Sequence, residues 1–287
     1  MTQRGAIIKR VALAVAVAVA TFALVYFVYL GSGIAGGGAA GEAVSGAQAA
    51  VDSVKDRLSR NVRNDAFGVG EKLRFDINYG FINAGSATME ILGPVEWNER
   101  ACYQIRTLAQ SNSFFTSIFP VNDTVTSILD GVGLCSWLFD KRLKEGSYKA
   151  QQVYHFDQID HKVIFKGDTF SVEPFAQDPL SVMYFVRTLD LTVGSSVFVP
   201  SFADGKAKPL EVKALRRETI EVEAGTFKCI VVEPLLYAAG IFKHEGKLTV
   251  WLTDDRLRMP VMMKSKVLVG AITAELTEYE LGEIQEF

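Results

Sequence analysis

The side chains best suited to chemistry lie in one short stretch, where two of the three histidines of the chain occur beside aspartates. His155 and Asp157 would share one face of a strand, and a hairpin would bring His161 near them, which places nitrogen and oxygen ligands together as in a metal site. Apolar residues alternate with these polar ones, so the pattern is also that of a strand with one solvated face. We favour this second interpretation and predict no metal ion and no cofactor.

A second candidate is the pair Asp254-Asp255, which follows Trp251. Paired carboxylates can carry acid–base catalysis, but aspartate side chains also commonly cap turns, and Arg256 can offset their charge. The sequence contains no Gly-x-Ser-x-Gly, His-Glu-x-x-His, Walker or dinucleotide-binding motif. We therefore expect a protein that is not an enzyme, with no catalytic residues, and keep an envelope hydrolase assembled from distant residues as an alternative.

A binding role has better candidates than catalysis. Arg187 is the one full charge within an apolar segment, and a buried guanidinium needs either a carboxylate partner or an anionic ligand. The chain also holds 19 Phe, 9 Tyr and 3 Trp, which either fill a core or line an apolar groove. The residues that we predict to contact a ligand are Arg187, Tyr184, Phe114, Phe115, Phe119 and Trp251.

These candidates require a scaffold, and the sequence predicts a mainly β one. Asp178-Pro179 is a helix N-cap followed by proline at the first helical position, and the segment to Leu189 is apolar on every side, as in a buried helix. From Glu71 onwards apolar and polar residues alternate, which indicates strands, and Ala224-Gly225 predicts a two-residue hairpin. We predict a strongly curved antiparallel sheet, or an incomplete barrel, wrapped around the one buried helix. The expected strands lie near 73–79, 84–92, 101–110, 121–129, 134–139, 147–157, 161–166, 196–203, 209–214, 218–224, 226–233, 247–253, 260–268 and 271–280.

The amino-terminal segment predicts attachment to a membrane. Val11 to Leu30 is a run of twenty uncharged residues, long enough as a helix to cross a bilayer of about 30 Å. Arg4, Lys9 and Arg10 precede it, so the positive-inside rule places the amino terminus in the cytoplasm and the carboxy-terminal domain outside. We expect a single-pass protein of the bacterial inner membrane with its domain in the periplasm. A cleaved secretory signal is the alternative.

Three regions follow from this division. Residues 1–35 form the transmembrane anchor or signal, 36–66 a Gly-rich linker with an amphipathic stalk helix, and 67–287 a β half-barrel domain. Within the linker, 42–64 carries a short heptad-like stripe, which predicts self-association or a solvated linker. The net charge of -3 shows no basic stripe, so we expect no nucleic-acid partner. The three cysteines are too few for a disulfide framework and are interpreted as small core residues.

Several segments resemble a known family. They are Phe67-Gly-Val-Gly-Glu-Lys-Leu-Arg-Phe75, Asp178-Pro-Leu-Ser-Val-Met-Tyr-Phe-Val-Arg187, Ala224-Gly-Thr-Phe227, and Val250-Trp-Leu-Thr-Asp-Asp-Arg256 with Pro260-Val261 and Gly270. In this order they resemble the bacterial domain-of-unknown-function family numbered 3108, over roughly 67 to 282. The resemblance implies an envelope protein similar to the lipoprotein-carrier half-barrels of the LolA/LolB type, where a curved sheet and a helix enclose an apolar groove. It implies no activity, because the family has none assigned.

These observations give a leading hypothesis and a rival besides the hydrolase. The leading one is a membrane-anchored periplasmic module that binds an apolar or lipid-like ligand, or an envelope partner, without catalysis. The rival is an interaction or scaffold subunit of an envelope complex, with a solidly packed barrel. A carrier should show a cavity of several hundred cubic ångströms open at one end, and a scaffold should show none.

Overall fold

The structure is a computed structural model, and it describes residues 58–235, 248–266 and 270–287. The predicted anchor Val11 to Leu30 and most of the predicted stalk therefore lie outside the described residues. In the described part of the chain no helix has the length and apolar character needed to cross a membrane. The described end of the stalk segment, residues 58–64, is not helical.

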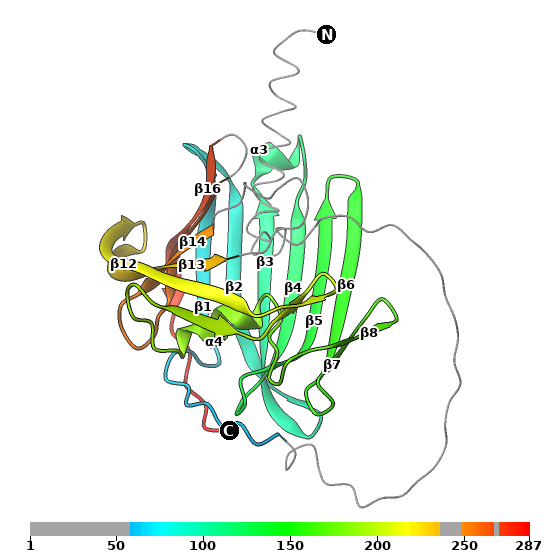
Figure 1. The fold of residues 1–287 in the computed structure, drawn as a ribbon. Helices are drawn as coiled ribbons and strands as arrows, with labels where there is room; N and C mark the ends of the chain where they lie inside the picture. Colours follow the sequence, from blue (N-terminus) through cyan, green and yellow to red (C-terminus); the bar gives the residue numbers. More distant parts are fainter. Residues whose placement is uncertain (1–57, 236–247, 267–269) are drawn as a thin grey trace, which may run out of the picture.

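Most of the described chain is β-structure, as predicted (Figure 1). The alternation of buried and exposed residues along the strands explains why these segments are extended, with one face turned to the core. The elements are β1 (Lys72–Tyr79), β2 (Ile82–Trp97), β3 (Arg100–Ser111), α3 (Ser113–Thr116), β4 (Asn122–Asp130), β5 (Ser136–Glu145), β6 (Tyr148–Asp157), β7 (Lys162–Phe165), β8 (Asp168–Ser171), α4 (Ser181–Arg187), β9 (Ser196–Val199), β10 (Phe202–Ala203), β11 (Lys206–Ala207), β12 (Leu210–Val222), β13 (Gly225–Leu235), β14 (Leu248–Thr253), β15 (Pro260–Lys266) and β16 (Ala271–Glu280).

Fourteen of these strands form one antiparallel sheet. Its order is β8-β7-β6-β5-β4-β3-β2-β1-β16-β15-β14-β13-β12-β9, so the first and last strands of the domain pair in its middle. The hydrogen-bond ladder does not close, because β8 and β9 are its two edges. In Figure 1 the long strands β2–β6 stand side by side, while β12 crosses in front of them.

The small hairpin β10–β11 lies between the two edges of the sheet. Phe202 of β10 contacts Phe170 of β8, with ring centroids 5.2 Å apart, and its backbone N–H donates to the carbonyl of Gln177. The same segment follows directly after edge strand β9. Side-chain packing therefore links the two edges where the ladder does not.

The structure corrects three details of the strand prediction. The expected strands 209–214 and 218–224 are one strand, β12, which a bulge between Ala214 and Arg216 bends. The turn between β12 and β13 consists of Glu223 and Ala224, one residue earlier than predicted, because Gly225 already pairs with Val222. The sequence analysis also missed the short elements α3, β8 and β11.

Candidate functional site

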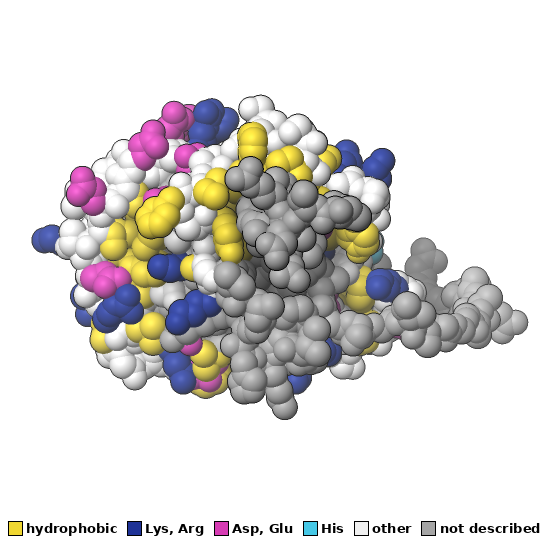
Figure 2. Space-filling model, turned by 90° about the horizontal axis from the view of Figure 1, so that it is seen from above, with side chains coloured by type: hydrophobic (Ala, Val, Ile, Leu, Met, Phe, Trp, Pro, Cys, Tyr) yellow, Lys and Arg dark blue, Asp and Glu magenta, His cyan; other side chains and the backbone are white. Residues whose placement is uncertain are grey.

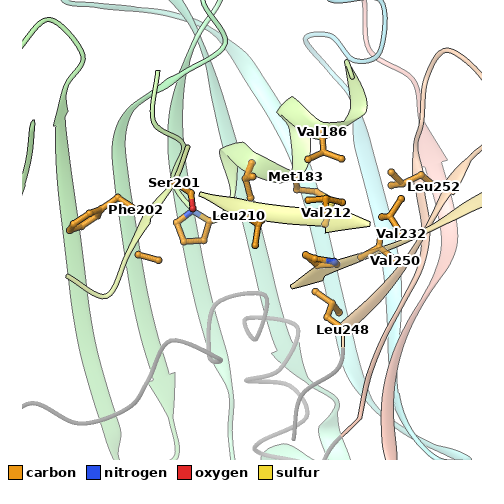
Figure 3. A pocket seen from close by; sticks show the side chains of 14 residues that line it. Met183, Val186, Ser201, Phe202, Leu210, Val212, Val232, Leu248, Val250 and Leu252 are labelled. Atoms are coloured by element: carbon orange, nitrogen blue, oxygen red, sulfur yellow. The ribbon is translucent and has the colours of Figure 1, made fainter. Parts of the chain in front are cut away.

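The candidate site is an apolar pocket between α4 and the strands β12, β13 and β14. In Figure 3, Met183 and Val186 of α4 face Val212 of β12 and Val250 of β14 across a common space. Among the described residues that line the pocket, only Ser201 has a polar side chain. The walls are formed by Pro179, Val182, Met183, Val186, Ser201, Phe202, Ala203, Leu210, Val212, Val232, Pro234, Leu248, Val250 and Leu252.

The walls follow from strand periodicity. On β14, Val250 and Leu252 point into the pocket, and on β12 Leu210 and Val212 do the same, because alternate residues of a strand share one face. Most of these side chains are branched aliphatics, which are stiff and leave fixed gaps when they oppose a helix.

The pocket is small. Its cavity volume is about 50 Å³. Ligand pockets usually measure roughly 300 to 1,000 Å³. The pocket therefore holds a small apolar group and falls short of the several hundred cubic ångströms expected of a carrier.

Asp178 fixes the start of α4 against the sheet. Its Oδ1 accepts the backbone N–H groups of Leu180 and Ser181, at 2.7 and 2.8 Å, so it caps the turn that leads into α4. The N-cap residue of α4 itself is Leu180, two residues later than predicted. Its Oδ2 accepts the hydroxyl groups of Ser127 on β4 and Ser136 on β5, at 2.6 and 2.5 Å. Complete burial raises the pKa of Asp178 above its ordinary value, although these hydrogen bonds oppose the shift.

Arg187 fixes the other end of α4. Its Nη1 and Nη2 donate to the two carboxylate oxygens of Glu71, both at 2.7 Å, and both side chains are almost fully buried. Nη2 also donates to the carbonyl of Ala66 and Nε to that of Leu257. Burial lowers the pKa of Arg187, but the Glu71 carboxylate raises it by more, so the net shift is upward. The guanidinium therefore joins α4 to the start of the domain and to the β14–β15 turn.

The six predicted ligand residues lie on different elements, and none of them lines the pocket. Tyr184 is fully buried next to Arg187, with its ring 5.1 Å from that of Phe67, and burial raises the pKa of its hydroxyl. Trp251 lies between Val250 and Leu252 on β14 and donates its Nε1–H to Glu218. It therefore points away from the pocket that its two neighbours line. The ligand contact proposed for Arg187 and Tyr184 stays a prediction.

The predicted aromatic loop 114–119 lies at the turn between β3 and β4. Phe114 is exposed, Phe115 is buried in the core, and their rings contact each other at 5.1 Å. Phe119 is half-buried against Gly146, where a Cβ atom would lie 2.9 Å from its ring. Only Phe114 of the three is available to a partner without a change of structure.

A second group of interior residues lies near the pocket and has the opposite character. Phe202 contacts the rings of Tyr154, Phe156, Phe165 and Phe170 at 5.2–6.4 Å, so aromatic rings fill this part of the interior. Buried charges accompany them. Asp204, which follows the pocket residue Ala203, accepts a hydrogen bond from the Tyr154 hydroxyl at 3.4 Å.

Three further ionisable groups lie on the inner side of β4 and β5. Burial raises the pKa of Asp123, and burial together with the neighbouring Asp123 raises the pKa of Glu145 to about 7. The Oδ2 of Asp123 and the Oε1 of Glu145 are buried acceptors for which no donor occurs among the described residues. The negative charge of Asp123 disfavours the charged form of Glu145, so Glu145 keeps its proton to a higher pH than an exposed glutamate does. Burial lowers the pKa of the adjacent Lys141.

The aspartates that were first considered for chemistry mostly cap turns, and the nearby histidines are exposed. Asp157 Oδ1 accepts the N–H groups of Ile159 and Asp160, and His155 and His161 are exposed. Asp255 Oδ1 accepts the N–H groups of Leu257 and Arg258, as expected of a turn cap. The charge of Asp254 is paired with Arg217, at 2.7 Å, and not with Arg256 as predicted.

Two remaining expectations concern metals and cysteines. The ranges that the structure describes contain no cluster of three metal-ligating side chains, and His244 lies outside them. Cys102, Cys135 and Cys229 are free and buried, and burial raises the pKa of the Cys102 and Cys229 thiols to about 12. These thiols are therefore unreactive core groups.

The fold and the pocket together define the class: a mainly β protein with one large, open antiparallel sheet and an apolar interior pocket beside its buried helix. The chain belongs to the family described as "Protein of unknown function (DUF3108)", whose model matches residues 74–277. This confirms the family resemblance. A search of curated proteins found no match to the chain.

Solved structures with a similar shape are distant in sequence. A β-barrel-like protein of domain of unknown function DUF1849 from Brucella abortus is 10% identical, with a TM-score of 0.49, and the match covers 76% of this chain and 100% of that one. A DUF1089 family protein from Pseudomonas aeruginosa is 11% identical, with a TM-score of 0.34 and coverage of 63% and 89%. A hypothetical protein from Chlamydia trachomatis is 8% identical, with a TM-score of 0.34 and coverage of 82% and 98%.

Proposed function

We propose that this protein binds an apolar or lipid-like ligand without catalysis, and that the pocket between α4 and β12–β14 receives the apolar end of that ligand. The observation that carries the proposal is the pocket itself, a mostly aliphatic space that is partly open and whose described lining contains one polar side chain, Ser201. An acyl chain is apolar along its length and only one methylene group wide, so it matches the apolar walls of this space. We further propose attachment to the bacterial inner membrane through Val11 to Leu30, with the domain in the periplasm, from the length and charge pattern of that segment.

The size of the pocket determines how the ligand enters. The cavity volume of about 50 Å³ is enough for only a few water-sized groups, so a long chain enters only if the walls move apart. Met183 is half-buried and lines the pocket from α4. Its flexible thioether side chain can change rotamer at little cost, which makes it the side chain best placed to admit a ligand.

One observation favours a second function. An aromatic cluster around Phe202 fills the neighbouring part of the interior, and the enclosed cavity is small. A solidly packed barrel of this kind suits an interaction or scaffold subunit of an envelope complex, which would bind its partner through the outer surface or through the segment 42–64. The experiment below separates the two functions.

The test is photocrosslinking of the full-length protein in nanodiscs whose phospholipids carry a diazirine on the acyl chain. We expect mass spectrometry to find acyl adducts on the pocket walls, in 179–186, 210–212 or 248–252. Met183→Trp should remove these adducts because the indole fills the space that the ligand needs. Leu189→Trp is the matched control, since Leu189 is also half-buried and close to α4 but does not line the pocket. Adducts confined to residues 1–57 would contradict ligand binding and favour the scaffold function.

A further inference from the structure

One end of the sheet carries a row of exposed apolar side chains. Phe81 and Ile82 lie at the β1–β2 turn, Phe114 and Ile118 at the β3–β4 connection, and Tyr148 at the β5–β6 turn; we call these five residues the hairpin rim. Phe81 is 108% exposed, Phe114 66% and Tyr148 51%. Figure 2 looks onto this end, where apolar side chains lie among both basic and acidic ones.

The strand order places the rim residues next to one another. The strands β1 to β6 are consecutive neighbours in an antiparallel sheet, so the turns after β1, β3 and β5 occur at the same end. Asn112 caps α3 by accepting the N–H of Phe115, and its Nδ2 donates to the carbonyl of Asn83 on β2, at 2.8 Å. Phe119 packs against Gly146 of the β5–β6 turn. The rim is therefore a preformed surface of linked turns.

The charges around the rim are basic. Lys144 and Lys149 flank the β5–β6 turn, and Lys266 ends β15; all three are exposed. The acidic side chain among the described residues of these turns is the half-buried Glu145, whose pKa burial and Asp123 raise to about 7. Exposed aromatic residues beside lysines are the combination that adsorbs to anionic phospholipid headgroups.

The opposite end of the domain has the reverse charge. Leu281 and Ile284 are exposed there as well, but Glu280, Glu283 and Glu286 surround them in the sequence and are exposed. Their negative charge disfavours contact with an anionic surface. Charge thus distinguishes the two ends although both expose apolar side chains.

The length of the chain before the domain permits the rim to reach a membrane. The described chain begins at the opposite end, where Arg60 donates hydrogen bonds to the carbonyls of Gly133 and Leu134. Residues 31–57 lie between the apolar run Val11–Leu30 and this point, and fully extended they span at most about 90 Å. The longest strand, β2 with 16 residues, spans about 53 Å. In its fully extended form the linker is therefore longer than the longest strand of the domain.

We propose that the hairpin rim docks onto the surface of an anionic phospholipid bilayer. This inference rests on the membrane attachment in the proposed function, but it does not depend on a ligand in the pocket. Docking would hold the domain against the bilayer by a surface at the end opposite to the start of the described chain. Phe81, Phe114 and Tyr148 would enter the headgroup region, and Lys144, Lys149 and Lys266 would face anionic headgroups.

The test is nitroxide labelling of the full-length protein in nanodiscs. The three native cysteines are buried, so a label attaches to a single introduced cysteine. Ser113→Cys and Ser147→Cys place it within the rim without removing a rim residue, and Asn98→Cys places it at the opposite end; all three positions are exposed. In nanodiscs that contain phosphatidylglycerol, we expect the two rim labels to be accessible to oxygen and protected from a nickel chelate. The Asn98→Cys label should show the reverse.

Matched variants identify the contact. Phe81→Ser with Phe114→Ser should abolish the protection of the rim labels. Phe198→Ser should leave it intact, because Phe198 on β9 is 64% exposed but lies outside the rim. Replacement of Lys144, Lys149 and Lys266 by Gln should lower the ratio of docked to free domain roughly fivefold per lysine, and this effect should vanish in pure phosphatidylcholine.

Three outcomes would overturn the proposal. One is equal accessibility of the rim and Asn98 labels. Another is protection that persists in the Phe81→Ser/Phe114→Ser variant. The third is protection that requires two protein molecules per nanodisc and comes with spin–spin broadening, which would assign the rim to a second copy of the chain. Loss of docking with intact acyl adducts in the pocket would refute this inference alone, and loss of the adducts with intact docking would refute the ligand proposal alone.

Discussion

The two sides of the domain interior are filled by different kinds of side chain. Around Phe202, Tyr154 and Phe165 the space is filled by rings packed edge to face. Between α4 and β12–β14, branched aliphatic side chains leave a pocket. Large planar rings on facing strands can interlock, whereas short stiff side chains cannot cross the distance to a helix. The pocket therefore results from the type of side chain that the same sheet carries on this side. It follows that mutations on the two sides should change the stability of the protein by different amounts.

The largest effect is expected where α4 is attached. Arg187→Met should lower the free energy of unfolding by about 3 to 5 kcal/mol, because it leaves the carboxylate of Glu71 buried and without its partner. Arg74→Met is the control, since the Arg74–Glu278 pair is exposed and such pairs contribute at most about 1 kcal/mol. Urea unfolding followed by circular dichroism measures both. Equal stabilities of the two variants would show that Arg187 does not fix the helix.

A smaller effect should distinguish the two sides of the interior directly. Val163→Ile on β7 adds a methylene group beside the aromatic cluster, where Val163 is 0% exposed, and should destabilise the protein by about 1 to 3 kcal/mol. Val250→Ile adds the same group towards the pocket. It should be neutral or should stabilise the protein by up to about 0.8 kcal/mol, the value of one buried methylene. If both variants lose the same stability, the pocket is not free space.

Some of these features could be predicted from the sequence and others could not. The alternation from Leu73 to Tyr79 predicts a strand, and Asp178-Pro179 before an all-apolar segment predicts the buried helix, because each pattern is local. The continuity of β12 was missed because Leu215, Arg216 and Arg217 interrupt the alternation that runs from Leu210 to Ala214. Strand periodicity on its own indicates that Trp251 faces away from Val250 and Leu252, a signal that the sequence analysis did not use.

The pocket could not have been found in the sequence. Val212, Val232 and Val250 are ordinary residues of buried strands, and a pocket arises only where the opposing surface fails to reach them. The ion-pair partner of Arg187 could not be predicted for the same reason. Glu71 is 116 residues away, and nothing in the local sequence indicates which carboxylate pairs with the guanidinium. Contacts between distant segments depend on how the whole sheet curves.

The smallest effect concerns the buried carboxyl groups. Burial raises the pKa of Glu145 to about 7 and that of Asp204 to about 6, so the folded protein binds protons that the unfolded chain releases. This stabilisation is complete below the ordinary pKa of about 4.5 and is lost as the pH rises through 7.

The free energy of unfolding should therefore fall between about pH 5 and about pH 8. We expect about 1 kcal/mol from Glu145, a reduced value because its side chain is partly exposed. The change should be smaller in Glu145→Gln, which cannot titrate. Urea titrations at the two pH values measure it, and the same pH dependence in the variant and the wild type would contradict the raised pKa of Glu145.

The central claim is that the space between α4 and β12–β14 accepts an apolar group and that the aromatic side does not. A crystal of the protein equilibrated under xenon tests it most directly, because xenon binds to apolar cavities without any polar contact. We predict xenon density bounded by Met183, Val212 and Val250, and its loss in crystals of Met183→Trp. Crystals without xenon at this place, or with xenon only between the rings of Tyr154 and Phe165, would contradict the account.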